Sequence, residues 1–100
     1  MTGLVSAQSA KQGNFPQICQ TGFAGMVVRF GDHLNAAGNR ACLAFAAAVK
    51  RSEIKGVLEV SSALQSVLLH YDPLRLTPQK LHGVLAALLN EQDWYAAALP

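Results

Sequence analysis

Three histidines are the side chains best suited to acid–base catalysis or metal binding, because neutral imidazole transfers protons and ligates metals near neutral pH. They are His33, His70 and His82, and no HxxxH or HExxH spacing joins any two of them. We therefore predict no metal site. We keep His70, which lies in an expected strand, as a candidate catalytic residue.

Two aspartates, Asp32 and Asp72, each follow an expected strand and are the other candidate catalytic residues. If the two carboxylates approach each other beside a substrate pocket, they suit general acid and base roles. An aspartate before a turn is also a routine cap of backbone amides. The sequence leaves both interpretations open.

The cysteines and glycines form no cofactor-binding motif. Cys19 and Cys42 stand alone, without CxxC spacing, and are expected as reduced thiols in the core. Gly22, Gly25 and Gly31 match neither GxGxxG nor GxxxxGK[ST], so we attribute them to an irregular strand. We expect no cofactor in this domain.

Length and composition predict one domain that contacts a partner. One hundred residues are enough for a single two-layer core. Hydrophobic residues make up 51% of the chain and charged residues only 14%, so little of the surface is polar. We therefore expect a partner to cover some apolar surface. The 8 basic and 6 acidic residues are scattered along the chain, so we expect no nucleic-acid partner.

The N-terminal residues 1–14 are polar and small, with neither helical nor strand periodicity, and are predicted to form a flexible tail. They lack the cationic start and continuous apolar stretch of a signal peptide. No apolar segment is long enough to cross a bilayer. We expect no membrane contact and a cytoplasmic location.

The first half of the chain predicts a strand and a helix. Residues 18–30 end in a β-branched and aromatic run and are expected to form one strand, interrupted by two glycines. Asn35 is the expected cap of a helix that continues to about residue 51, with Lys50 and Arg51 at its negative end.

The second half predicts a hairpin and a second helix. Strands are expected at 57–60 and 66–71, separated near Ser61 and Ser62. Thr77 and Pro78 begin a helix that ends near residue 90. Residues 94–99 are short and apolar, and the sequence leaves open whether they form a closing edge strand or a link.

This order of elements predicts an α+β fold for residues 15–100. Two amphipathic helices bury their apolar faces economically on one face of an antiparallel sheet. The order β-α-β-β-α, with a possible last strand, matches the ferredoxin-like two-layer sandwich.

The chain resembles the allophanate hydrolase subunit 1 family, also called the KipI or PxpB family, over about residues 17–100. Four short segments carry the resemblance in the right order and spacing: Phe30-Gly31-Asp32, Gly56-Val57-Leu58-Glu59-Val60, Leu68-Leu69-His70-Tyr71-Asp72-Pro73-Leu74 and Leu76-Thr77-Pro78. The resemblance implies an N-terminal ferredoxin-like domain whose C-terminal cyclophilin-like domain is absent after residue 100.

The resemblance further implies a partner and a reaction. Family members pair with a sister subunit, allophanate hydrolase subunit 2-like, in a carboxyltransferase-like assembly. This assembly is associated with the ATP-dependent opening of 5-oxoproline and was historically described as hydrolysing allophanate. This domain alone is then expected to have little activity and to act in assembly. One branch instead inhibits a sensor histidine kinase, which is the alternative function.

Two departures from the family pattern bear on that inference. Phe23 after Gly22 stands where relatives commonly have aspartate, and residues 62–64 (Ser-Ala-Leu) stand where they have a Pro-x-aromatic element. An acidic group and an aromatic contact are therefore missing. A family member that only scaffolds an assembly is a further hypothesis.

Overall fold

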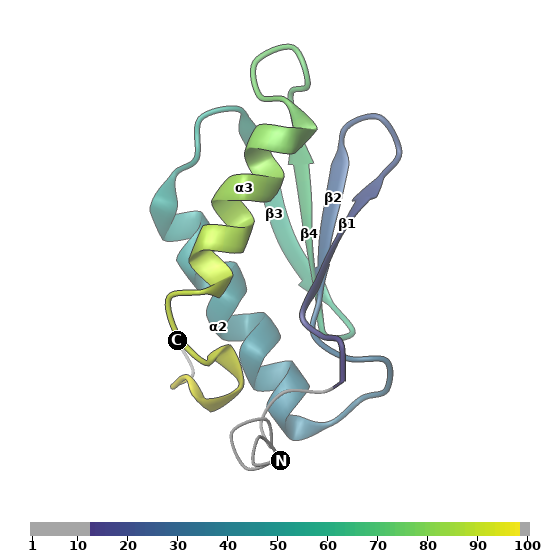
Figure 1. Ribbon diagram of the computed structural model, residues 1–100, viewed down its shortest axis with the longest axis vertical. Coiled ribbons are helices and arrows are strands. Elements are labelled where there is room, and N and C mark those ends of the chain that lie inside the picture. Colours follow the sequence, from purple (N-terminus) through teal and green to yellow (C-terminus); the bar gives the residue numbers. More distant parts are fainter. Residues whose placement is uncertain (1–12, 99–100) are drawn as a thin grey trace.

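The computed structural model describes residues 13–98, in the order of two strands, a helix, two strands, a helix and a short 3-10 helix. Most of the predicted tail, residues 1–12, lies outside the described residues. The elements are β1 Gln17–Thr21, β2 Gly25–Arg29, α2 Ala36–Ser52, β3 Val57–Ala63, β4 Ser66–Tyr71, α3 Pro78–Leu89 and η1 Trp94–Ala96 (Figure 1).

The prediction of one strand over residues 18–30 was wrong, because this segment is a hairpin of β1 and β2. Gly22 opens the turn with a φ of +67°, a backbone conformation that glycine adopts without steric penalty. Thr21 then pairs with Gly25, and the two strands are antiparallel. The glycines therefore make a turn, where we had expected an irregular strand.

The sheet has four antiparallel strands in the order β1-β2-β4-β3. From β2 to α3 the chain follows the predicted β-α-β-β-α order, and the α+β class is confirmed. The remaining edge position belongs to β1, not to residues 94–98, and residue 99 lies outside the described residues. Residues 94–96 instead form η1, which begins where Asp93 Oδ1 accepts a hydrogen bond from the Tyr95 amide.

The turn of the second hairpin lies later than predicted. Ser61 and Ser62 belong to β3, and the turn is formed by Leu64 and Gln65, whose φ angles are +51° and +67°. The polar serines suggested a break, but an exposed edge strand accommodates small polar side chains. The Gln65 side chain is buried and accepts a hydrogen bond from the Asn35 amide at 2.9 Å.

Both helices cover one face of the sheet, as predicted (Figure 1). Val67, Leu69 and Tyr71 of β4 point into the core and are at most 2% exposed, whereas Leu68 and His70 face away. The predicted caps are present, because Asn35 Oδ1 accepts from Gly38 N and Thr77 Oγ1 accepts from Lys80 N. The helices therefore begin where expected.

The core is closed by an aromatic cluster of Phe30, Phe45, Trp94 and Tyr95. Phe45 packs edge-on against Phe30 at 5.6 Å and against Trp94 at 5.1 Å between ring centroids. Edge-to-face contacts of this kind contribute beyond the area they bury. The cluster thus joins the residue that follows β2 to α2 and η1.

No helix among residues 13–98 combines the length and the apolar character needed to cross a membrane.

Candidate functional site

The two candidate aspartates lie at opposite ends of the sheet. Arg29, near the end of β2, pairs with Ser66 at the start of β4, while Gly25 pairs with His70 near the end of β4. Asp32 follows β2 and Asp72 follows β4, so antiparallel pairing separates them by the length of the strands. The two carboxylates therefore do not approach each other, which was the condition for a joint general acid and base role.

Each aspartate has a local partner. Asp72 Oδ1 accepts a hydrogen bond from the Leu74 amide at 3.0 Å, and its carbonyl accepts from the amides of Arg75 and Leu76. Asp72 therefore organises the loop between β4 and α3. Asp32 Oδ1 lies 2.8 Å from His33 Nδ1, and both side chains are more than 60% exposed.

The histidines lie on three separate surfaces. His33 is in the loop after β2, His70 is on the open face of the sheet, and His82 is on α3. Among residues 13–98 no three or more His, Cys, Asp or Glu side chains come together as metal ligands would. His70 of β4 lies opposite Glu59 of β3 in the sheet, and both side chains line a hollow of about 240 Å³.

The two cysteines differ in environment. Cys42 is buried, its thiol donates a hydrogen bond to the Ser66 carbonyl, and burial raises its pKa. Cys19 is exposed, contrary to the expectation of a core thiol, because its side chain points to the open face of the sheet. Neither is in a disulfide. Only Cys19 is therefore available to solvent.

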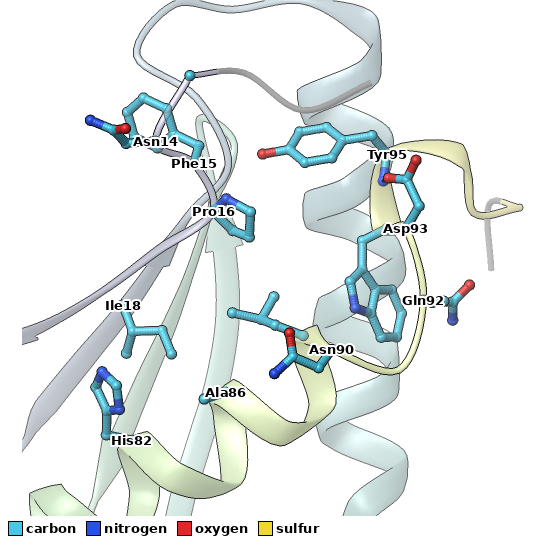
Figure 2. A pocket seen from close by; sticks show the side chains of 13 residues that line it. Asn14, Phe15, Pro16, Ile18, His82, Ala86, Asn90, Gln92, Asp93 and Tyr95 are labelled. Carbon is cyan, nitrogen blue, oxygen red and sulfur yellow. The ribbon is translucent and has the colours of Figure 1, made fainter. Parts of the chain in front are cut away.

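A groove of about 690 Å³ separates β1 from α3 and the segment around η1 (Figure 2). Ile18 and Pro16 form one wall, and Ala86 and Tyr95 belong to the other. Trp94 of η1 also lines the groove. Its volume lies in the range of ligand pockets in proteins. Prediction from sequence missed this groove because its second wall depends on η1, where we had expected a strand or a link.

Polar groups reach the groove from α3 and the segment that follows it. His82 and Asn90 lie on the same side of the helix, and Asn90 extends toward the middle of the groove (Figure 2). The polar atoms of the two aromatic side chains already form hydrogen bonds within the protein. Trp94 Nε1 donates to the Leu88 carbonyl, and Tyr95 Oη donates to the Phe30 carbonyl. The groove can therefore accept hydrogen-bonding and apolar groups.

The Tyr95 hydroxyl makes the stability of this wall sensitive to alkaline pH. Burial, and next the negative charge of Asp93, raise the pKa of Tyr95 to about 12 from its ordinary 10.0. The unfolded chain therefore loses the Tyr95 proton at a lower pH than the folded chain. The stabilisation that Tyr95 provides is complete below pH 10 and is lost as the pH rises toward 12. We expect the free energy of unfolding to fall by about 2 kcal/mol over this interval through Tyr95 alone.

Urea denaturation of the native protein and of Tyr95→Phe between pH 9 and pH 12 checks this expectation. The variant lacks the hydrogen bond to the Phe30 carbonyl, so it is less stable at pH 9. The difference between the two proteins should then shrink as the pH rises. A difference that stays constant to pH 12 would show that Tyr95 does not control the alkaline transition.

Two exposed apolar side chains stand on neighbouring loops at one end of the sheet, and we call Phe23 and Leu74 the apolar tip. Phe23 is 78% exposed in the β1–β2 turn, and Leu74 is 91% exposed in the β4–α3 loop. A hydrogen bond from the amide of Tyr71, the last residue of β4, to the Ala24 carbonyl joins the end of β4 to the β1–β2 turn. Both loops lie at the same end of the molecule (Figure 1).

Comparison with known proteins adds a family match. A family model described as "Carboxyltransferase domain, subdomain C and D" matches residues 16–98. No curated protein sequence matches the chain. The family match therefore covers nearly all the residues that the structure describes.

Several solved structures share the fold. The conserved uncharacterized protein PH0987 from Pyrococcus horikoshii aligns with a TM-score of 0.68 over 72% of this chain, at 24% identity. Kluyveromyces lactis urea carboxylase gives 0.61 over 70%, also at 24% identity, and TTHA0988 gives 0.58 over 63%, at 35% identity. The aligned part is 33%, 6% and 13% of those chains, respectively. The chain thus spans a third or less of each of these proteins.

Proposed function

Because the chain belongs to the family of the carboxyltransferase domain, subdomains C and D, we propose that it serves as the assembly domain of an ATP-dependent amide or lactam hydrolase. In this proposal it is the N-terminal domain of one subunit, of 5-oxoprolinase or allophanate hydrolase type, and docks onto the sister subunit. ATP is used by the complete complex. The resemblance to the allophanate hydrolase subunit 1 family is confirmed at the level of the carboxyltransferase domain.

The apolar tip is the observation that carries the proposal. Phe23 and Leu74 are among the most exposed large apolar side chains of residues 13–98, yet the loop that presents Leu74 is fixed by hydrogen bonds to Asp72. Large exposed apolar groups on ordered loops are typical of protein contacts, because anchoring them in a partner loses little loop entropy. The tip is therefore suited to insertion into an apolar pocket of the sister subunit.

Two further observations support assembly as the role of this domain. The three histidines lie on separate surfaces, and Asp32 and Asp72 lie at opposite ends of the sheet, so the domain offers contact surfaces more readily than a catalytic constellation. The related chains are also at least about twice as long as this one, because the aligned parts are only 33%, 13% and 6% of their lengths. Amide chemistry is supported by two solved structures of similar fold, named urea carboxylase and urea amidolyase.

Binding to the sister subunit tests the proposal. The full chain is titrated against the subunit 2-like protein of the same genome by biolayer interferometry, alongside the double variant Phe23→Ser/Leu74→Ser. We expect the double variant to bind at least about tenfold more weakly, since buried apolar anchors dominate interface energies. Hydrolysis of 5-oxoproline and allophanate with ATP is measured in the reconstituted mixture.

Leu64→Ser is the matched control, because Leu64 is also 78% exposed but lies at the opposite end of the sheet. Because Leu64 lies outside the proposed contact, this variant should bind the sister subunit within about twofold of the affinity of the native protein. Absence of any complex would refute the assembly function. An equal loss with Leu64→Ser would refute the assignment of the contact to the apolar tip.

A further inference from the structure

The two edge strands of the sheet differ in how they are protected from pairing with another chain. Exposed edges offer unpaired amides and carbonyls, and proteins commonly protect them with charges and β-bulges. β3 has both, since Glu59 lies in it and its register shifts between Val57 and Glu59. β1 has neither, because Gln17–Thr21 contains no charged residue and pairs with β2 in an unbroken register.

The groove between β1 and α3, which we call the α3–β1 groove, leaves space beside the unprotected edge of β1. Ile18 of β1 lines the cavity of about 690 Å³, and Gln20 lines a second hollow of about 290 Å³ that shares His82 with the first and reaches Pro78. These are the β1 side chains on the helix side of the strand. An added strand would direct its own side chains on that side into the same space.

We propose that β1 pairs with β1 of a second copy of this chain, antiparallel, about a twofold axis at Cys19. In this register Cys19 faces Cys19, Gln17 faces Thr21, and Ile18 faces Gln20 across the axis. All five side chains of the strand are uncharged, so no like charges meet. The two sheets join into one of eight strands, and this contact is separate from the apolar tip.

The second copy is favoured as the occupant by the charge pattern of the two edges. A strand that pairs with itself about a twofold axis brings identical groups close together, so a charge near the axis repels its own copy. β1 carries no charged side chain along its whole length, so it avoids this repulsion. β3 does not, because Glu59 lies next to the centre of the strand.

Cys19 reports directly on this pairing. It is free and exposed on the open face of the sheet, whereas Cys42 is buried. Directly opposed residues in an antiparallel pair have Cα atoms about 4.5–5.5 Å apart. A short bismaleimide should therefore join two copies of the native protein and of Cys42→Ser, but not of Cys19→Ser.

Sedimentation equilibrium of the full 100-residue chain over a range of concentrations provides the quantitative test. We expect the mass to rise with concentration from 10.6 kDa toward twice that value. Cys19→Lys places two ammonium groups opposite each other at the axis and should weaken the dimer at least about tenfold. Circular dichroism confirms that each variant is folded.

Ser61→Lys is the matched control. Ser61 lies in the same cross-strand row as Cys19, in the order Cys19, Val27, Leu68, Ser61, but on the other edge of the sheet. This variant should leave the dimer within about twofold of the native protein, because its lysine is remote from the axis. A mass that stays monomeric, no Cys19-dependent crosslink, or a larger effect of Ser61→Lys than of Cys19→Lys would each overturn the proposal.

Discussion

Replacing Gly38 with alanine should destabilise the protein by about 3 kcal/mol, although alanine is the better helix former. Gly38 lies in the first turn of α2, directly against the buried side chain of Gln65. A Cβ at this position would overlap the Gln65 side-chain oxygen. Gln65 must then move, and its hydrogen bonds to the Asn35 amide and the His33 carbonyl are lost.

Gly83→Ala is the natural comparison, because a Cβ at Gly83 in α3 meets nothing within 4 Å. This substitution should stabilise the protein by about 1 kcal/mol through helix propensity. The free energies of unfolding of both variants are measured by urea denaturation. Two glycine-to-alanine changes in two helices are thus expected to have opposite signs.

A double-mutant cycle separates the overlap from other causes. Gln65→Ala alone should cost about 2 kcal/mol, since it removes a buried side chain with two hydrogen bonds. Adding Gly38→Ala to it should then cost little, because the atom it would strike is absent. Additive effects of the two substitutions would show that Gly38 is required for some other reason.

The sequence predicts the fold best where a pattern is local and strong. Asn35 and Thr77 cap their helices as expected, because capping depends on one side chain and the first turn. The hairpin of β1 and β2 was missed because an apolar run with two glycines suits an interrupted strand as well as a turn. The positive φ of Gly22 and the pairing of β1 with β2 distinguish the two, and neither can be read from the residue types alone.

The candidate sites show the same limit more strongly. Asp32 and Asp72 both follow strands, but the direction of those strands is a property of the whole sheet. The α3–β1 groove is lined by residues near both ends of the described chain, such as Pro16 and Tyr95. No local pattern encodes that these two segments meet at one groove. A useful signal was present in Trp94 and Tyr95, because two adjacent aromatic residues seldom remain exposed.

Trp94→Ala should be the most damaging single substitution considered, with an expected loss of about 4 kcal/mol in the free energy of unfolding. Trp94 is only 4% exposed, packs edge-on against Phe45, and donates its indole N–H to the Leu88 carbonyl. It therefore holds η1 against both α2 and the end of α3. Urea denaturation followed by circular dichroism measures the loss.

Trp94→Phe separates the contribution of the aromatic packing against Phe45 from that of the indole hydrogen bond to the Leu88 carbonyl. It retains an aromatic ring beside Phe45 but lacks the indole N–H, and the Leu88 carbonyl still accepts a hydrogen bond from the Glu91 amide. We therefore expect a smaller loss, of about 1–2 kcal/mol. If Trp94→Ala instead costs less than about 1 kcal/mol, the aromatic cluster does not fasten η1. Because Trp94 is the only tryptophan, its fluorescence in the native protein checks independently whether this side chain is buried.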